Sequence, residues 1–294
     1  MQLRLVRYFL AIARERHFAR AADSCGVTQP TLSAGLAALE RQLGRRLVLR
    51  DRRFIGLTPE GEALLPWARQ MVAAHEGMAA ALSESAGPLQ GEFRLGAIPA
   101  ALPLTGRLAR ALLDTHPALG LSVRSLTSRE IVRALADFEL DGGLTYLDHE
   151  PPADVLSVPI YAESYRVVVR ANAGLAERES ISIAEVAQMP LCLLHQGMQN
   201  RRILDARVAE RSHALHPRVT ADSYVTLLSM VEAGPYATIV PDSYVTLLPE
   251  LGWAQVLPFE EPLASSRIGL IVLDRTPLTP TASAAIEAAR AIAI

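Results

Sequence analysis

The sequence predicts an α/β protein in two parts: a helix-rich N-terminal winged helix-turn-helix and a larger C-terminal domain with two α/β lobes. Three observations predict it. Two helical segments flank a glycine turn near the N-terminus, a long helical repeat follows, and strand and helix patterns then alternate towards the C-terminus. The chain has 294 residues, 50% of them hydrophobic and 20% charged, which is enough for several folded cores.

Charge is unevenly distributed along the chain. Residues 1–66 contain eleven arginines and six acidic residues, a net charge of +5, and the whole chain has −2, which leaves −7 for residues 67–294. A basic domain joined to an acidic one suits phosphate binding, because neutralising DNA phosphates releases counterions. We therefore expect the N-terminal part to bind nucleic acid.

The sequence also bears on the cellular location of the protein and on the roles of its two cysteines. It has no run of eighteen apolar residues, and arginines interrupt its apolar N-terminal stretch, so we expect a cytoplasmic protein without a membrane span or signal peptide. Cys25 and Cys192 are the only cysteines and belong to different predicted domains. This disfavours a disulfide, a cysteine metal cluster and a peroxide sensor with paired thiols, so each is interpreted as a small buried hydrophobe and no cofactor is expected.

The first sixty residues predict a helix-turn-helix followed by a wing. An amphipathic support helix covers 3–15, and an alanine-rich helix then ends at a turn containing Gly26. Thr28 is placed to cap the next helix, which has Pro30 in its first turn and stops at Gly44. The segment after Gly44 alternates charged with β-branched and aromatic residues, which predicts a short hairpin.

The start of the second helix of such a unit enters the major groove of DNA. Glutamine can pair with adenine, serine and threonine reach bases or phosphates, and arginines in the wing clamp phosphates, although a merely solvated loop is the alternative for those arginines. The expected DNA contacts are Thr28, Gln29, Pro30, Thr31, Ser33, Arg50, Arg52 and Arg53.

A long helix is predicted next. Thr58, Pro59 and Glu60 form a strong helix start, and the helix would reach Ser85, roughly 40 Å further on at the usual rise per residue. Apolar or neutral residues recur with the spacing of a coiled-coil seam at Leu64, Ala68, Met71, His75, Met78 and Leu82. A small domain cannot bury such a stripe alone, so we expect a second copy of the chain to cover it.

Strand and helix patterns alternate through the remainder of the chain. The first βαβαβ unit is predicted from strands at 92–98, 121–126 and 142–147 with helices at 104–115 and 128–140. A second such lobe follows, and a strand at 266–274 and a helix at 281–292 would return to the first. The heptapeptide DSYVTLL occurs at 222–228 and 242–248, which is interpreted as a shared helix-capping solution rather than a repeat architecture.

The carboxyl ends of the strands predict a ligand site. Free N–H groups at helix N-termini and nearby hydroxyls suit a small anion such as a carboxylate. For Thr127 and Ser128 taken singly, simple helix capping is an equal alternative. The expected effector contacts are Pro99, Ala100, Ala101, Thr127, Ser128, Tyr146, His195, Gln196, Gly197, Asn200 and Tyr224.

The segment FARAADSCGVTQPTLSAGLAALERQLGRRLVLRDRRFIGLTPEGEALL resembles the DNA-binding motif of LysR-type transcription regulators. The matches are Ala21-Ala22, Val27, Gln29-Pro30, Leu32-Ser33, Leu39-Glu40, Leu43-Gly44, Leu47, Arg50, Leu57-Thr58 and Gly61. The chain departs from the family pattern at Ala34-Gly35 and Val48-Leu49, and Gly35 is expected to loosen the helix by about 1 kcal/mol relative to alanine. The resemblance implies dimerisation through the long helix, commonly tetramers, and an effector domain similar to the periplasmic-binding-protein fold.

These features predict a regulator that binds double-stranded operator DNA as a homodimer or homotetramer under control of a small-molecule effector. Its expected domains are 1–58 for DNA binding, 59–87 for dimerisation and 88–294 for the effector, with lobe I at 91–161 and 266–294 and lobe II at 162–265. An enzyme is disfavoured because no Walker loop, GxGxxG, GxSxG or HExxH motif is present. A transport protein would need a signal peptide, and an architectural DNA binder would leave the lobes unexplained.

Overall fold

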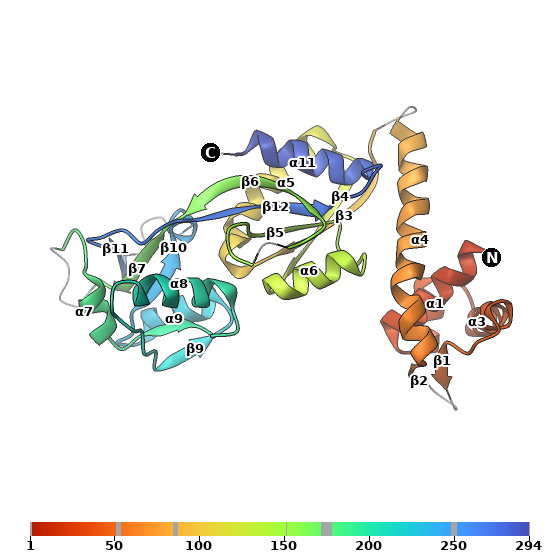
Figure 1. Cartoon of the computed structure of the whole chain (residues 1–294), viewed down its shortest axis with the longest axis horizontal. Coiled ribbons are helices and arrows are strands. Elements are labelled where there is room, and N and C mark those ends of the chain that lie inside the picture. The colour runs from red at the N-terminus through yellow and green to blue at the C-terminus, as the bar shows by residue number, and fades with distance from the viewer. Residues whose placement is uncertain are drawn as a thin grey trace. The chain divides into compact units, whose positions relative to one another are not determined.

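The computed structural model describes residues 2–50, 54–84, 88–150, 152–171, 178–247 and 252–293. The chain forms two compact units (Figure 1). The first unit comprises Met1–Pro88 with Ala134–Glu139, and the second comprises Leu89–Arg133 with Leu140–Ile294. None of the described helices is long and apolar enough to cross a membrane.

Three short helices and a hairpin begin the first unit. Helices α1 (Leu3–Glu15), α2 (Phe18–Ser24) and α3 (Gln29–Leu43) are followed by strands β1 (Val48–Arg50) and β2 (Phe54–Leu57), which pair antiparallel. The Thr28 hydroxyl accepts a hydrogen bond from the Thr31 N–H, and Gly44 ends α3 with a φ of 65°. The predicted cap, glycine stop and wing are therefore confirmed.

Two polar side chains fix the hairpin to the helices around it. Glu40 of α3 accepts hydrogen bonds from the N–H groups of Leu47 at 2.9 Å and Val48 at 3.3 Å. The Thr58 hydroxyl donates to the Arg46 carbonyl at 2.6 Å and accepts from the Gly61 N–H at 3.0 Å, which caps α4 (Pro59–Glu84). The start of the long helix is thus held beside the wing.

Gly35 has a packing role that its sequence context does not indicate. A Cβ atom on Gly35 would lie 2.5 Å from a ring carbon of Tyr8, which belongs to α1. The missing side chain allows α3 to approach the Tyr8 ring, and both residues are buried in the core of the unit. Glycine at this position lowers the helix propensity of α3, but it also allows α3 to pack closely against α1.

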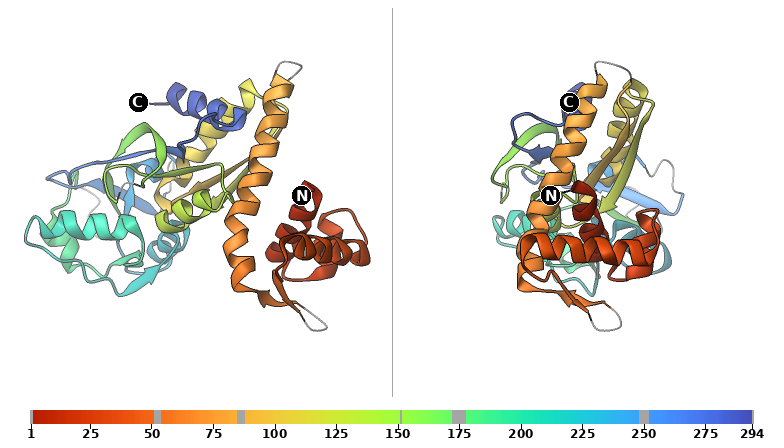
Figure 2. Two further views of the ribbon diagram at one scale, coloured as in Figure 1. Left: turned by 45° about the vertical axis from the view of Figure 1, so that its right-hand side comes forward. Right: turned by 90° about the vertical axis from the view of Figure 1, so that its right-hand side faces the viewer.

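Helix α4 divides its apolar residues between two surroundings, and Figure 2 shows its N-terminal half beside the short helices of the same unit. Leu64 and Ala68 pack against the core formed by α1, α2 and α3. Trp67 is 67% exposed and Met78 is 59% exposed, and Met71 is also exposed. The expected seam therefore differs from the exposed apolar stripe. Its first two residues, Leu64 and Ala68, pack into the core of their own unit, whereas Trp67, which was not expected in the seam, is exposed. The Leu82 side chain lies outside the described residues.

The first lobe of the second unit is built on a five-stranded sheet with the order β4-β3-β5-β12-β6. Strand β3 runs parallel to β4 and β5, whereas β12 is antiparallel to β5 and β6. The strands are β3 (Gly91–Ala97), β4 (Leu119–Ser125), β5 (Gly142–Tyr146), β6 (Val155–Glu163) and β12 (Ser266–Leu273). Figure 1 shows α11 (Pro280–Ala291) and α5 (Leu102–Thr115) on one face of the sheet and α6 (Ser128–Ala136) on the other; the short 3-10 helix η1 (Pro99–Ala101) precedes α5.

The parallel βαβαβ unit and the return of the C-terminal strand are confirmed, but β6 was missed by the sequence analysis. Pro159 in the middle of β6 lacks a backbone N–H, which argues against a central strand. The structure accommodates it because β6 is the edge strand and pairs on one side only, with β12.

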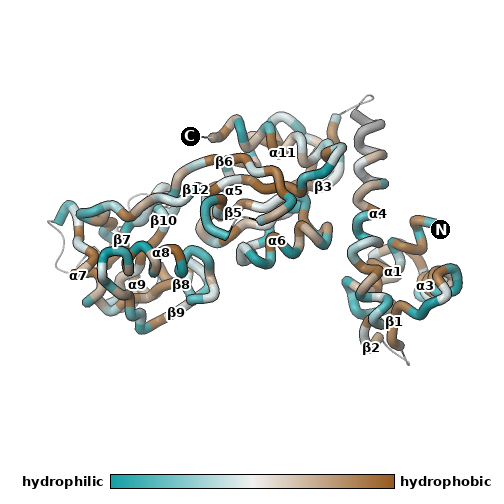
Figure 3. Tube along the Cα trace, viewed as in Figure 1, coloured by the Kyte–Doolittle hydropathy of each residue, from teal (hydrophilic) through white to brown (hydrophobic). Residues whose placement is uncertain are grey.

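The second lobe is mixed rather than a second parallel unit. Strands β10 (Thr238–Pro241) and β11 (Ala254–Pro258) flank β7 (Tyr165–Arg170) antiparallel, and β8 (Cys192–Leu194) pairs parallel with β9 (Val219–Ala221). A parallel bridge joins Leu191 to Ala237 and links the two sets of strands. The helices are α7 (Ile183–Gln188), α8 (Gln199–Ala209), α9 (Tyr224–Ala233) and α10 (Asp242–Val245). Figure 3 shows the hydrophobic stretches on the strands of both lobes, where the core clusters lie.

The two copies of DSYVTLL do begin helices after strands, α9 and α10, but the capping interpretation was wrong. Neither Ser223 nor Pro241, the residues that precede these helices, makes a side-chain cap hydrogen bond. The repeated element instead supplies Tyr224 and Tyr244, whose ring centroids lie 4.5 Å apart.

Candidate DNA interface and ligand pocket

The N-terminal turn of α3 presents its polar side chains to solvent. Thr28, Gln29, Pro30 and Thr31 are exposed, and Ser33 is half-buried. The hydroxyls of Thr28 and Thr31 lie 2.9 Å apart and hydrogen-bond to each other. Of these five expected contacts, Gln29 has the longest side chain and is the best placed to reach base edges.

The expected phosphate-binding arginines are only partly described. Arg50 is the last residue of β1, and only its backbone is described. Arg52 and Arg53 lie outside the described residues. Arg45 and Arg46 precede the strand and are exposed. Their place beside the end of α3 extends a basic surface towards the wing.

A small pocket lies between the lobes of the second unit. Its residues come from the ends of β3 and β8 and the starts of η1, α6 and α8, and its cavity volume is about 10 Å³, near the minimum for one water molecule. The lining residues are Ile98, Pro99, Ala100, Thr127, Ser128, Leu194, Met198, Gln199 and Asn200.

The structure brings together five of the eleven expected effector residues at this pocket: Pro99, Ala100, Thr127, Ser128 and Asn200. Six others do not line it: Ala101, Tyr146, His195, Gln196, Gly197 and Tyr224. Ala101 is the last residue of η1 and is buried, and the turn that holds His195, Gln196 and Gly197 is exposed. Tyr146 and Tyr224 are buried behind the pocket wall. As ligand contacts these six stay predictions.

Thr127 is engaged in capping α6. Its N–H and its hydroxyl each donate to a Glu130 carboxylate oxygen at 2.8 Å, and its hydroxyl accepts from the Glu130 N–H at 3.3 Å. The hydrogen bonds from the Thr127 backbone and side chain lower the pKa of Glu130, which keeps a negative charge at this helix start. The α6 end of the pocket is thus less favourable to an anion than the sequence suggests.

Asn200 connects the pocket to a buried polar cluster. Its amide nitrogen donates to the Tyr146 hydroxyl and, at 3.1 Å, to a Glu163 oxygen, and its amide oxygen accepts from the Tyr224 hydroxyl at 2.8 Å. The Tyr146 hydroxyl also donates to Glu163. Tyr146 and Glu163 belong to the sheet of the first lobe, which extends through β6 two residues past the expected boundary at 161, and Tyr224 belongs to the second lobe. One amide therefore joins both lobes behind the pocket.

Glu163 is the carboxyl group of this cluster, and its pKa is raised. It is fully buried at the end of β6, and burial raises its pKa to about 8 although hydrogen bonds from Tyr146 and Asn200 act in the opposite direction. Its Oε2 atom has no hydrogen-bond partner in the part of the chain that the structure describes. The group is therefore mainly protonated at neutral pH.

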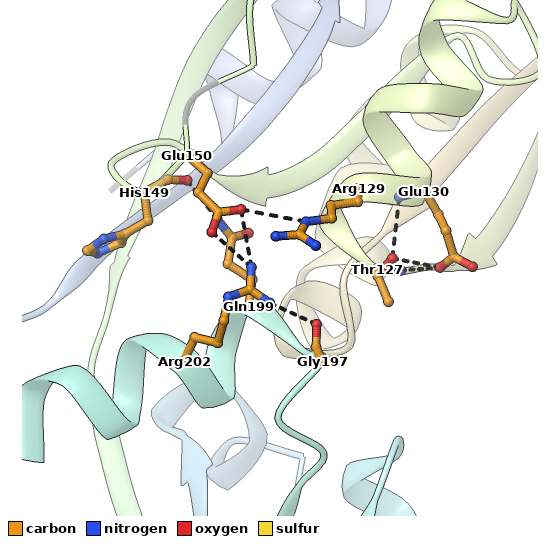
Figure 4. Close-up of polar contacts among 8 residues, drawn as sticks. All are labelled: Thr127, Arg129, Glu130, His149, Glu150, Gly197, Gln199 and Arg202. Atoms are coloured by element: carbon orange, nitrogen blue, oxygen red, sulfur yellow. Dashed lines mark hydrogen bonds and ion pairs between the residues drawn. The ribbon is translucent and has the colours of Figure 1, made fainter.

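Charged residues of both lobes meet next to Thr127 and Gln199, two residues that line the pocket (Figure 4). Arg202 of α8 contacts both carboxylate oxygens of Glu150 at 3.1 and 3.2 Å and donates to the Gly197 carbonyl at 2.8 Å. Arg129 of α6 approaches the same carboxylate at 4.0 Å. Gln199 donates to the His149 carbonyl at 2.6 Å. Two contacts from α8 thus hold the His149–Glu150 loop of the first lobe.

The position of α8 depends on a buried arginine. The Arg201 guanidinium is almost completely buried and donates to Asp205 at 2.8 Å and to the carbonyls of Leu194 and Leu215. These bonds tie the first turn of α8 to the end of β8. They thereby position Gln199 and Asn200, which both line the pocket.

The two cysteines occupy different units. Cys192 is buried in β8, and burial raises its pKa to about 11, which makes its thiol unreactive at neutral pH. The prediction of a small buried hydrophobe is confirmed for Cys192, whereas Cys25 is only partly buried. Among the described residues no cluster of histidine, cysteine and acidic side chains could hold a metal ion.

Sequence reasoning missed Gln199, Glu150, Arg202 and Glu163. Gln199 directly precedes the predicted Asn200 at the same helix start, so its position was a usable signal. Glu163 lies in the unpredicted strand β6, and the Glu150–Arg202 pair joins residues fifty-two positions apart. The residues around Glu163, and those around Glu150 and Arg202, carry no sequence pattern that indicates these contacts.

The fold and these sites define a protein with a winged helix-turn-helix DNA-binding unit and a two-lobed ligand-binding domain. Family models match both parts: the bacterial regulatory helix-turn-helix protein of the lysR family over residues 3–62, and the LysR substrate binding domain over residues 86–293. The chain belongs to the LysR family of transcription regulators, which are DNA-binding regulators and not enzymes.

Relatives and solved structures agree with this assignment. A probable hydrogen peroxide-inducible genes activator of Mycobacterium avium is 33% identical over 268 residues, which cover 90% of this chain and 86% of that protein. A full-length OxyR variant from Pseudomonas aeruginosa has a TM-score of 0.79 at 27% identity and covers 99% of this chain and 95% of its own. Full-length CbnR in complex with its target DNA has a TM-score of 0.70 at 23% identity over 100% of both chains, which shows the shared fold alone.

Proposed function

We propose that this regulator binds operator DNA with the start of α3 in the major groove, and that a small molecule held between the lobes controls its binding. The observation that carries the proposal is the exposed first turn of α3, where Gln29 is free to reach base edges beside a basic wing. Such a regulator of chromosomal genes would act in the cytoplasm.

Dimerisation through α4 is part of the proposal. The helix has 26 residues and, with Trp67, Met71 and Met78 exposed, presents apolar surface that the described part of its own unit does not cover. A second copy of α4 would bury it, and paired copies would place two α3 helices on half-sites about one helical turn, ~34 Å, or a multiple apart. The corresponding domain division is 1–58, 59–87 and 88–294, and the assembly is a homodimer or a homotetramer.

We propose a non-covalent effector for this chain. The M. avium relative is named for induction by hydrogen peroxide, but here Cys192 is buried with a raised pKa and Cys25 belongs to the DNA-binding unit. The pocket instead offers helix starts, an asparagine and a glutamine, with Arg202 next to Gln199. A small anion such as a carboxylate fits the arginine, and binding that changes the lobes would change the arrangement of the DNA-binding units.

The DNA assignment is tested with matched variants on the duplex upstream of the protein's own gene and on a scrambled duplex. Gln29→Ala should lower the preference for the operator by about 1–3 kcal/mol, whereas Gln42→Ala, an exposed glutamine at the far end of α3, should leave it unchanged. Arg50→Ala should weaken binding to both duplexes alike and reduce the salt dependence, and Arg110→Ala in the second unit should not. Equal effects of all four substitutions on both duplexes would refute the assignment.

A further inference from the structure

The pocket between α6 and α8 contains a buried polar atom, Gln199 Oε1, that no described residue pairs with. Gln199 is 6% exposed and lines the pocket, and its amide nitrogen donates to the His149 carbonyl at 2.6 Å. A backbone carbonyl can only accept, so this contact fixes which end of the amide is the nitrogen. The Gln199 Oε1 atom is then a buried acceptor without a hydrogen-bond partner among the described residues.

Two of the other polar side chains that line the pocket are already used, and the third, the half-buried Ser128 hydroxyl, can either donate or accept. Both ends of the Asn200 amide bond to the buried cluster, and the Thr127 hydroxyl donates to Glu130. An acceptor left unpaired in a buried site destabilises the protein, and a ligand that brings a donor removes that penalty. This pocket therefore selects a ligand with a hydroxyl or amine group.

Positive charge is available one helical turn further along α8. Gln199 and Arg202 are three residues apart, so their side chains are neighbours on one face of the helix, and Figure 4 shows both directed towards the His149–Glu150 loop. The partner of Arg202 is Glu150, whose side chain is 53% exposed and which also lies 4.0 Å from Arg129. An exposed ion pair of this kind contributes little stability, so another carboxylate can replace Glu150 at low cost.

We propose that the effector is a small carboxylate with a hydroxyl or amine on the neighbouring carbon. Its carboxylate replaces Glu150 on Arg202, and its donor group bonds to Gln199 Oε1. Glu150 is thus an internal competitor for the effector. The cavity admits little more than one water molecule, so binding displaces the His149–Glu150 loop that α8 holds. The inference rests on the proposed function and specifies the ligand of the same pocket.

Three probes that differ only at the neighbouring carbon test this: sodium acetate, sodium glycolate and glycine, each compared with sodium chloride at equal ionic strength. Calorimetric titration and thermal unfolding of the full chain should show that glycolate or glycine binds about fivefold more tightly than acetate. Gln199→Met, which keeps the length and removes the acceptor, should abolish that difference.

Glu150→Gln should tighten the binding of all three probes several-fold because it removes the competing carboxylate. The matched control is Glu210→Gln, which disrupts the Arg207–Glu210 pair on the same helix away from the pocket and should change nothing. Equal affinity for acetate and glycolate in the wild-type chain, or no binding of any probe to Glu150→Gln, would overturn the proposal. If Gln199→Met does not fold, the comparison of acetate with glycolate on the wild-type chain and the Glu150→Gln variant still test the proposal.

Failure of the effector inference and failure of the proposed function give different results. Probes that bind as expected without altering operator affinity would support the pocket chemistry and refute its regulatory role. A molecule without a carboxylate that alters operator affinity through this pocket would support the regulatory role and refute the proposed ligand class.

Discussion

The two sites of this regulator are built in opposite ways. The DNA-binding unit has its proposed DNA contacts on the surface at the start of one helix, held by local contacts such as the Thr28–Thr31 pair. The pocket of the second unit is lined by buried groups from distant segments, and its polar cluster joins Tyr146, Glu163 and Asn200. The difference teaches that substitutions at the DNA interface change recognition with little effect on folding, whereas substitutions at the pocket change both.

Asn200→Leu should give the largest loss of stability. It removes the donor to Glu163 and Tyr146, which keep their bond to each other, and it leaves the buried Tyr224 hydroxyl without its acceptor, at a cost on the order of 3 kcal/mol. Urea unfolding followed by Trp253 fluorescence in a Trp67→Phe background reports on the second unit. A loss below about 0.5 kcal/mol, the level of an ordinary surface substitution, would show that the cluster is not a structural link.

Glu163→Gln should change how stability depends on pH. Burial raises the pKa of Glu163 from 4.5 to about 8, so the folded chain binds more protons than the unfolded chain between these values, and stability falls as pH rises through that range. The glutamine variant should match the wild-type chain near pH 5 and exceed it by a few kcal/mol near pH 9. Parallel stability curves for the two proteins across this range would contradict a protonated Glu163.

Gly35→Ala is a smaller test, within the DNA-binding unit. Alanine favours a helix by about 1 kcal/mol, but its Cβ would lie 2.5 Å from the Tyr8 ring, so we expect a net destabilisation of about 1 kcal/mol. Gly106→Ala in α5 meets no atom within 4 Å and should stabilise the chain instead. Trp67 fluorescence in a Trp253→Phe background follows the first substitution, and Trp253 in a Trp67→Phe background follows the second. The same sign for both substitutions would refute the packing role of Gly35.

The sequence predicted what depends on neighbours along the chain. Thr28, Gly44 and Thr58 act through hydrogen bonds or backbone angles within a few residues, so their helix ends could be placed from the sequence. The same applies to Pro99, Ala100 and Asn200, which follow predicted strands at the edge where ligands bind.

What the sequence did not predict depends on contacts between distant segments. Strand β6 was missed because Pro159 is tolerated only where one side of the strand is unpaired, and edge position is a property of the sheet. The close approach of Gly35 to Tyr8 and the meeting of Glu163 with Asn200 follow from helix and lobe packing. The secondary-structure propensities of single residues do not predict these two contacts.

Sedimentation of the full chain with a labelled duplex spanning the region upstream of its own gene tests the central claim most directly, because it gives stoichiometry and affinity together. We predict two or more chains on each duplex and an affinity that falls steeply between about 50 and 200 mM salt, as phosphate contacts by the arginine-rich unit require. One chain per duplex, or an affinity that does not change with salt, would contradict the account.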